Sequence, residues 1–421
     1  MDKAICSECA EDIYLKKIIE DECEPVVCSV CGEADNKAIS VQELGKLMEP
    51  IMREHFRLGG SYKRFGENDE EWWEQSGESM SWVVQQVLGQ YFKFEDEIVD
   101  AVVDAENCWP PDGDEPFWES TTNYVETRVQ IGHYYARWNW VLDELKHNRR
   151  FFNTSAEALF GEIFDGVDEL QAWDGRRSRP VVRILSKGTT LFRARILSSE
   201  AMFKDVYAEP LRHIGPPPKE TARAGRMNAE GIVVFYGSCE QKTCLAEMRP
   251  ALGNELAVIS LETTKPLRVL DFSRLDQARG GKVLSYFQPD FSSEVEKSAF
   301  LRRIHALISQ PILPGKEADY LITQTMAEYL SHVHDKPFDG ILFASAQRNG
   351  GTNVVLFAKE NMDLVTDSIS DVFRLSYVDR TLEIFSTNSI SYKHRKVDVY
   401  IDDKTGEPWR YDQHNGDDED E

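Results

Sequence analysis

The chain has 421 residues and a formal net charge of −25. This length is too great for one ordinary hydrophobic core and predicts two or three domains. Hydrophobic residues make up 41% of the chain and charged residues 29%, a balance that excludes a wholly disordered protein. Because the chain is acidic and has no stripe rich in Lys and Arg, binding to nucleic acid is disfavoured.

No segment of the sequence is typical of a membrane protein. It contains no apolar run of about eighteen residues. The first residues of the chain include charged residues and cysteines, where a signal peptide would have an apolar core. We therefore expect a cytoplasmic protein that does not contact a membrane.

Cysteines crowd at the N-terminus, where two C-x-x-C knuckles lie within the first 31 residues. The knuckle cysteines are Cys6, Cys9, Cys28 and Cys31. In a cytosolic chain such crowding indicates a metal site more than disulfides. Four thiolates complete a tetrahedral zinc site, and the bound metal replaces a core that about forty residues cannot build. We interpret residues 1–40 as a zinc-ribbon-like segment with a structural zinc. Free or redox-active thiols are the alternative, and a fifth cysteine, Cys23, complicates the count.

Residues 41–175 show helical periodicity. Apolar residues recur at steps of three and four, as in Val83, Val84, Val87 and Leu88. Turn-forming pairs such as Gly59-Gly60 and Pro110-Pro111 divide the segment into several helices. We predict an all-α domain over residues 41–175.

After Arg176 the pattern changes to short β-branched runs with helices between them. The expected strands cover 181–185, 189–193, 231–236, 256–260, 340–343 and 353–357, and the expected helices cover 242–248, 294–309 and 317–334. We predict an α+β catalytic domain over residues 176–360. A β extension over 361–410 and a disordered acidic tail over 411–421 are expected to follow.

Arginines of the third domain suggest an anion-binding cleft. Arg193 and Arg195 point to the same side of an expected strand, because side chains repeat every second residue. A proline- and glycine-containing loop delivers Arg226 just before the next strand. Guanidinium groups bind phosphates bidentately, so a diphosphate is a suitable ligand. Taken singly, each arginine is equally well explained as a solvated surface charge.

Three further residues accompany these arginines. Tyr236 ends an expected strand, and Ser238 with Gln241 fits a helix capping box that places Glu247 on the following helix among apolar neighbours. A strand at 340–343 runs into a glycine-rich turn that exposes Ser345. No G-x-S-x-G, G-x-G-x-x-G or P-loop motif is present, which argues against α/β hydrolases, Rossmann dehydrogenases and P-loop NTPases.

Five ordered blocks between residues 191 and 357 resemble the RES domain, a family named for its Arg, Glu and Ser and found as the toxin of bacterial toxin–antitoxin pairs. The blocks hold Arg193 and Arg195, Arg226, Tyr236, Glu247, and Ser345. The resemblance implies an ADP-ribosyltransferase-like split β-sheet that clamps NAD. It also implies NAD consumption by hydrolysis, phosphorolysis or transfer of ADP-ribose to a protein.

The resemblance also implies roles for these residues. Cleavage of the nicotinamide–ribose bond passes through an oxocarbenium-like state. We expect Glu247 to stabilise that cation, with Arg226 and Ser345 as further catalytic residues. Arg193, Arg195, Arg226, Tyr236 and Ser345 are expected to bind NAD. A phosphate acceptor would require a spare cation, for which Arg348 and Arg195 are candidates.

The stretch 140–152 resembles the HEPN-type helical domain that accompanies RES domains. Arg128 and His133 have the R-x4-H spacing of HEPN ribonucleases, but a valine follows the arginine, and we interpret His133 as a packing histidine. A non-catalytic NAD sensor and a HEPN ribonuclease are the rival functions. Expected partners are NAD, a cognate antitoxin or regulatory partner, and a second copy of the chain in a homo-oligomer.

Overall fold

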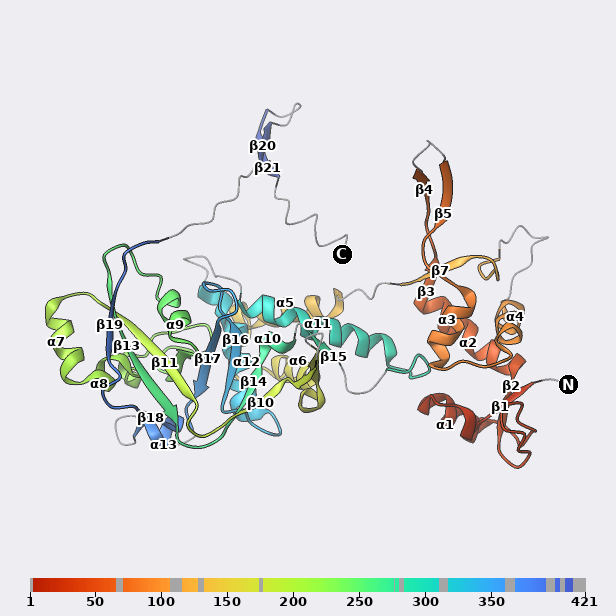
Figure 1. The fold of residues 1–421 in the computed structure, drawn as a ribbon, viewed down its shortest axis with the longest axis horizontal. Coiled ribbons are helices and arrows are strands. Elements are labelled where there is room, and N and C mark those ends of the chain that lie inside the picture. Colours follow the sequence, from red (N-terminus) through yellow and green to blue (C-terminus); the bar gives the residue numbers. More distant parts are fainter. Residues whose placement is uncertain are drawn as a thin grey trace.

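A computed structural model describes residues 3–65, 71–106, 116–127, 132–173, 177–275, 277–279, 284–309, 317–359, 368–390, 398–401 and 406–411. Arg128, Arg176 and the acidic tail lie outside these ranges. The described residues form two lobes that lie side by side along the long axis (Figure 1), an N-terminal lobe of residues 3–127 and a C-terminal lobe that begins at Gly132. No helix of the described ranges is both long and apolar enough to cross a membrane.

The N-terminal lobe packs three main helices around one core that also includes the cysteine-rich segment. Ile5, Leu15 and Ile39 of that segment share a single apolar cluster with α2, α3 and α4. The elements are β1 Ala4–Cys6, η1 Ser7–Cys9, α1 Ile13–Glu22, β2 Ala38–Ser40, α2 Val41–His55, β3 Phe56–Leu58, β4 Ser61–Phe65, β5 Glu71–Gln75, β6 Glu78–Ser79, α3 Met80–Leu88, α4 Glu95–Ala105 and β7 Asn123–Glu126.

The prediction of an all-α domain after residue 40 is wrong. The strands β3, β7 and β6 form a small sheet, and β4 and β5 form a hairpin that projects from the lobe (Figure 1). These strands have two to five residues. Such short runs are too brief to show the alternation of apolar and polar residues by which strands are recognised.

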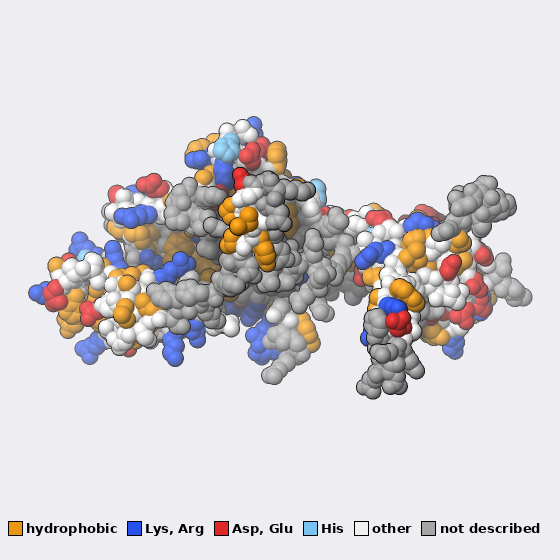
Figure 2. All heavy atoms as spheres, turned by 90° about the horizontal axis from the view of Figure 1, so that it is seen from above, with side chains coloured by type: hydrophobic (Ala, Val, Ile, Leu, Met, Phe, Trp, Pro, Cys, Tyr) orange, Lys and Arg blue, Asp and Glu red, His pale blue; other side chains and the backbone are white. Residues whose placement is uncertain are grey.

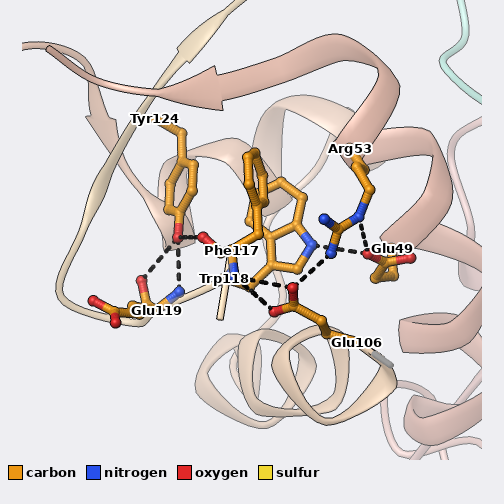
Figure 3. A network of polar contacts seen from close by, with 7 residues as sticks. All are labelled: Glu49, Arg53, Glu106, Phe117, Trp118, Glu119 and Tyr124. Carbon is orange, nitrogen blue, oxygen red and sulfur yellow. Dashed lines mark hydrogen bonds and ion pairs between the residues drawn. The ribbon is translucent and has the colours of Figure 1, made fainter. Parts of the chain in front are cut away.

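A polar network closes the C-terminal end of this lobe over α2 (Figure 3). Arg53 forms ion pairs with Glu49 and Glu106, at 2.6 and 2.8 Å, and its guanidinium lies 4.8 Å from the centre of the Phe117 ring. Glu106 accepts hydrogen bonds from the main-chain N–H groups of Phe117 and Trp118. Burial opposes the charge of Glu106, but these N–H groups and Arg53 outweigh it and lower the pKa of the carboxyl. The network therefore joins the two sides of the 107–115 segment to α2.

The C-terminal lobe is built on a nine-stranded mixed sheet. Its elements are α5 Gly132–His147, α6 Thr154–Phe164, η3 Val167–Glu169, β8 Gln171–Trp173, β9 Ser178–Pro180, β10 Val182–Leu185, β11 Thr190–Leu197, α7 Glu200–Ala208, α8 Pro210–Ile214, η4 Lys219–Thr221, β12 Val234–Ser238, α9 Gln241–Glu247, β13 Glu255–Thr263, β14 Leu267–Asp271, α10 Phe272–Leu275, β15 Ala278–Arg279, α11 Phe291–Ser309, η5 Glu317–Tyr320, α12 Leu321–Glu328, η6 Tyr329–Val333, β16 Gly340–Ala344, β17 Thr352–Phe357, α13 Ile369–Phe373, β18 Leu375–Tyr377, β19 Glu383–Ser386, β20 Asp398–Ile401 and β21 Pro408–Tyr411.

The sheet is divided between β12 and β11. The strand order is β10-β14-β16-β17-β12-β11-β13-β18, with β19 also paired to β13, and β14 and β16 are its parallel neighbours. Where β12 meets β11, the register holds one pair, Phe192 with Ser238. By contrast β11 and β13 pair over eight positions. The two halves of the sheet therefore diverge beyond that single pair.

Apolar residues cover both faces of this sheet, because side chains alternate along each strand. Ile341 and Val355 pack under α5, α6, α11 and α12, whereas Leu342 and Val354 pack against α7, α8 and α13. Helices α5 and α6 thus belong to the core of the C-terminal lobe, although the expected domain boundary at residue 176 places them before it.

The sheet also extends past the expected boundary at residue 360. Part of the expected β extension, residues 369–373, forms helix α13, and β18 and β19 pair with β13 at the edge of the main sheet. The β20–β21 hairpin ends at Tyr411, one residue past the expected extension, and stands away from the body of the C-terminal lobe and from the N-terminal lobe (Figure 1). Figure 2 shows acidic and basic side chains interspersed on the visible face of both lobes, so the net charge does not gather there into one patch.

The lobes meet at the N-terminal end of α11. The His55 ring lies 4.7 Å from the Phe291 ring, and Gln86 donates a hydrogen bond of 2.8 Å to the Tyr286 hydroxyl. Phe287 is buried in the core of the N-terminal lobe. From this contact α11 runs into the C-terminal lobe, where Phe300 packs beneath the sheet (Figure 1).

Candidate active site

A cavity of about 1210 Å³ opens where the two halves of the sheet diverge. Its walls are β11, β12, the 212–234 segment, the C-terminal end of α9 and the end of β16. Five of the residues expected from the sequence line it, namely Arg193, Arg195, Arg226, Tyr236 and Glu247. Ser345 lies behind the wall, between the lining residues Ala344 and Ala346.

Arg226 lies at the tip of a tightly held turn. The Gly225 N–H donates to the Asn228 carbonyl at 2.9 Å, and Gln324 on α12 donates to the carbonyls of both residues. Thr323 donates to the Arg226 carbonyl at 2.6 Å. The Arg226 guanidinium lies 5.9 Å from the centre of the Tyr320 ring, and burial lowers the pKa of the group. The backbone is thus fixed by α12 while the charged end lines the cavity.

The Tyr236 hydroxyl is used to hold that same turn. It donates to Asn228 Oδ1 at 2.9 Å and accepts from the Met227 N–H at 3.0 Å. Burial raises the pKa of Tyr236 to about 12, so the phenol is neutral at physiological pH. A Cβ atom at Gly225 would lie 2.7 Å from both the Tyr236 hydroxyl and Asn228 Oδ1, which explains the glycine. The ring of Tyr236 is the part left for a ligand.

Arg193 and Arg195 bind main-chain carbonyls. Arg193 donates from Nε to Ile214 at 2.6 Å and from Nη1 to Tyr236 at 2.5 Å. Arg195 donates from Nη1 to His213 at 2.6 Å. Burial lowers the pKa of Arg193 to about 10, so the guanidinium still carries its charge at neutral pH. Both side chains therefore fasten the C-terminal end of α8 to the sheet.

Glu247 is the last residue of α9, and one of its carboxylate oxygens is held twice. Oε1 accepts from Ser345 Oγ at 2.5 Å and from Asn353 Nδ2 at 2.8 Å. Ser345 Oγ in turn accepts from the main-chain N–H groups of Gln347 and Arg348, each at 3.1 Å. The glycine-rich turn after β16 thus directs the serine at the glutamate rather than into the cavity.

The expected capping box at Ser238 is wrong. Ser238 is the last residue of β12 and donates to Asn353, whereas Glu240 is the N-cap of α9. The strand therefore continues two residues past its expected end at 236, and Gly237 and Ser238 pair with β17 before the helix begins. The prediction failed because capping boxes and strand ends share the same small polar residues.

Three further polar residues lie near the cavity, namely Arg348, Cys244 and Arg249. Arg348 donates to Thr243 Oγ1 at 2.9 Å and lies 3.7 Å from Glu240, so it does not provide the spare cation expected for phosphate. Burial raises the pKa of Cys244, which lines the cavity, to about 12 and leaves it a poor nucleophile. Arg249 also lines the cavity and has a φ of 46°, a backbone strain of the kind found at binding sites.

The knuckle cysteines converge in the N-terminal lobe. The four Sγ atoms lie within 4.8 Å of one another, and those of Cys6 and Cys31 are 3.7 Å apart. Burial opposes ionisation of Cys28, but the N–H groups of Cys31, Cys6 and Val30 outweigh it and lower the pKa of the thiol to about 6. Thiolates about 3.8 Å apart are what a tetrahedral zinc site requires. The cluster can bind a metal, and Cys23 lies outside it.

The interpretation of His133 as a packing histidine is wrong. Its side chain is 63% exposed, 3.9 Å from Glu296, and it lies at the start of α5. Glu296 also accepts hydrogen bonds from the main-chain N–H groups of His133 and Tyr134, so it caps the N-terminal end of this helix. Arg128 lies outside the described residues.

Sequence reasoning missed Asn353, Asn228 and Arg249. Asn353 stood inside an expected strand whose apolar neighbours hid it, although a polar residue in a buried run is a usable signal. Asn228 follows Arg226 by two positions, and Arg249 follows Glu247 by two. Their roles depend on contacts between distant segments.

Comparison of the chain with curated proteins and with solved structures gave no match. The comparison with family models gave one, which supports the resemblance carried by the five blocks and extends it to β18. Residues 190–378, which hold the cavity and all its arginines, match the model of the RES domain family.

Proposed function

We propose that the chain is an NAD-degrading enzyme that breaks the bond between nicotinamide and ribose and passes ADP-ribose to water or phosphate. The observation that carries this proposal is the asymmetric holding of Glu247. Oε1 accepts two hydrogen bonds, whereas no described residue donates to Oε2, and the side chain lines the cavity. A fixed carboxylate with one free oxygen suits a ribose that gains positive charge.

The reaction breaks the bond from ribose C1′ to the pyridinium nitrogen. The bonding electrons stay with nicotinamide, which leaves neutral, and C1′ becomes cationic. Glu247 Oε2 accepts a hydrogen bond from a ribose hydroxyl, and its negative charge stabilises this cation electrostatically. Water or phosphate then attacks C1′, and the attacking group gives up its proton to solvent.

Arg226 and Arg249 are the cations we assign to the diphosphate. Arg226 faces the cavity from its fixed turn, and among the described residues no carboxylate pairs with it. We assign the ring of Tyr236, which lines the cavity, to stacking on nicotinamide. Arg193 and Arg195 take a different part from the one expected, since their hydrogen bonds to main-chain carbonyls make them supports of the cavity wall.

The divergence of β11 and β12 beyond one pair supports an ADP-ribosyltransferase-like fold for the C-terminal lobe. Toxicity held in check by a cognate partner follows from the family, because uncontrolled loss of NAD would harm the host cell. We propose both on these grounds. We also propose a structural zinc on Cys6, Cys9, Cys28 and Cys31, which would tie β1 to the turn at 28–31.

The test is to incubate the purified protein with NAD, with and without phosphate, and to identify the products by mass. Free ADP-ribose indicates hydrolysis, a phosphorylated ADP-ribose indicates phosphorolysis, and a mass gain on protein indicates transfer. Glu247→Gln and Arg226→Ala should each lower nicotinamide release by about 10²-fold or more, whereas Glu255→Gln, on the exposed end of β13, should not. Unchanged release in both site variants would exclude the proposal. NAD binding without release would favour a sensor.

A further inference from the structure

We infer that Asn353 is a positioning residue that fixes the carboxylate of Glu247, and that Ser238 fixes Asn353 in turn. The inference rests on the proposed function in assigning the reaction, but its geometric content concerns this chain alone. Asn353 Nδ2 donates to Glu247 Oε1 at 2.8 Å, and Ser238 Oγ donates to Asn353 Oδ1 at 2.9 Å. Ser238 and Asn353 stand directly opposite each other on β12 and β17.

The partners determine which way the Asn353 amide faces. The carboxylate of Glu247 can only accept, so it requires the NH₂ group of the amide. The amide oxygen is then free to accept a hydrogen bond from the Ser238 hydroxyl. A flipped amide would point its oxygen at the Glu247 carboxylate and lose the hydrogen bond to it, although the Ser238 hydroxyl could still accept from the amide nitrogen. Ser238 is 2% exposed and Asn353 is 6% exposed, so water is poorly placed to replace either partner.

The relay supplies what Ser345 alone cannot. Ser345 belongs to the turn after β16 and Asn353 to β17, whereas Glu247 ends α9, so two donors from the sheet side hold one oxygen of a helix residue. With a single donor, the carboxylate could turn about that contact and move Oε2. With two donors on Oε1, the direction of Oε2 is set. Positioning of this kind matters most in the transition state.

Every buried atom of this polar network has a partner, and the free Oε2 of Glu247 lies at its open end. None of its side-chain oxygen or nitrogen atoms is among the buried atoms that lack a partner in the described residues. Complete networks of this kind hold one arrangement, whereas removal of one member leaves the others unpaired. Loss of Asn353 should therefore disturb Glu247 more than it disturbs the fold of the lobe.

The experiment compares Asn353→Ala and Ser238→Ala with Thr263→Val. Thr263 is an equally buried hydroxyl of the same sheet, bonded to Ser186 and Thr189 and absent from the cavity wall. We expect Asn353→Ala to lower kcat about 10- to 100-fold with KM within about threefold, because the ground-state contacts survive. Ser238→Ala should act in the same direction more weakly, and Thr263→Val should leave kcat within about twofold. In a Glu247→Gln background, Asn353→Ala should cost no further activity.

Additive losses in that background, or a rise of KM with unchanged kcat, would overturn the inference. Crystal structures of both variants separate this result from the fate of the proposed function. If the wild-type protein releases no nicotinamide, the proposed function fails, and the position of Glu247 still decides the inference. A displaced carboxylate in the variants supports it, and an unmoved one refutes it. Should Asn353→Ala not fold, Ser238→Ala carries the same comparison.

Discussion

Arg193 on β11 donates a hydrogen bond of 2.5 Å to the main-chain carbonyl of Tyr236 on β12. This hydrogen bond joins the two strands where their ladder holds only the pair of Phe192 and Ser238. A second hydrogen bond reaches Ile214. The side chain thus bridges the two halves of the sheet at the wall of the cavity.

Replacement of Arg193 by Met should therefore destabilise the C-terminal lobe. Two main-chain carbonyls would lose charged donors, and hydrogen bonds of this type contribute about 1.5–3 kcal/mol each. Removing the buried charge relieves its desolvation and offsets part of this contribution, so we expect a loss of about 2–4 kcal/mol in the free energy of unfolding, measured by urea denaturation. Arg195→Met is the matched control, with an exposed guanidinium and one such hydrogen bond, and should cost less than about 1 kcal/mol. Equal stability of the two variants would contradict the bridging role.

Gly225→Ala should impair NAD turnover by moving Arg226. The added Cβ would lie 2.7 Å from the Tyr236 hydroxyl and from Asn228 Oδ1, so the turn must shift. A misplacement of about 1 Å can cost about 10²-fold in rate, and we expect kcat/KM for NAD to fall at least about tenfold. Gly132→Ala, where an added Cβ meets no atom within 4 Å, should be neutral. A fully active Gly225→Ala variant would show that the turn is not held as described.

Cys28→Ser should abolish metal binding. The expected zinc content of the wild-type chain is one ion, which the variant should lose because a hydroxyl is a poor ligand in a four-thiolate site. The N-terminal lobe should also melt at a lower temperature, since residues 1–40 share its core. Metal analysis and calorimetry measure the two effects. Cys23→Ser should keep the metal, and its loss there would mean that the ligand set is different.

The stability of the lobe interface should depend on pH through His55. Burial against Tyr286 and Phe291 lowers the pKa of His55 below its usual 6.5, although Glu54 and Glu126 partly oppose the shift. Above that pH the residue is neutral in both states and contributes no pH dependence. Below it the unfolded chain takes up the proton first, so stability falls as the pH decreases.

His55→Gln removes this effect, because glutamine does not titrate. Between pH 7 and about 5, the wild-type protein should lose more free energy of unfolding than the variant does. Thermal or urea denaturation of both proteins across this range provides the comparison. Parallel pH profiles would show that His55 is not buried as an uncharged residue.

Much of the C-terminal lobe could be predicted because its strands repeat a local signal. The runs at 340–343 and 353–357 alternate between two apolar faces, and both form central strands as expected. The C-x-x-C pairs likewise carry their own geometry. The strands of the N-terminal lobe escaped prediction, since Glu78–Ser79 and Phe56–Leu58 gain their pairing from distant segments.

The sequence predicted which residues lie at the site better than it predicted what each side chain does there. Glu247 and Arg226 line the cavity as expected, but Arg193 bonds to the wall and Ser345 faces Glu247. A sequence indicates that a polar residue is present, whereas the direction of its side chain depends on which segments fold around it. Asn353 illustrates this, because its contact with Glu247 joins positions 106 residues apart.

Helix α11 makes the two lobes difficult to separate. Its 19 residues span about 28 Å, from Phe291 at the N-terminal lobe to Ser309. On its last turns, His305 Nε2 accepts a hydrogen bond from the N–H of Ala344, beside Ser345. A fragment starting at residue 176 would lack α5 and α6, which form part of its core, and would expose Tyr286 and Phe287 to water. Such a fragment should aggregate. Its inactivity would therefore not show whether the N-terminal lobe regulates the activity of the C-terminal lobe. The N-terminal lobe should instead be studied in the full chain, by loosening the hydrogen bond from Gln86 to Tyr286.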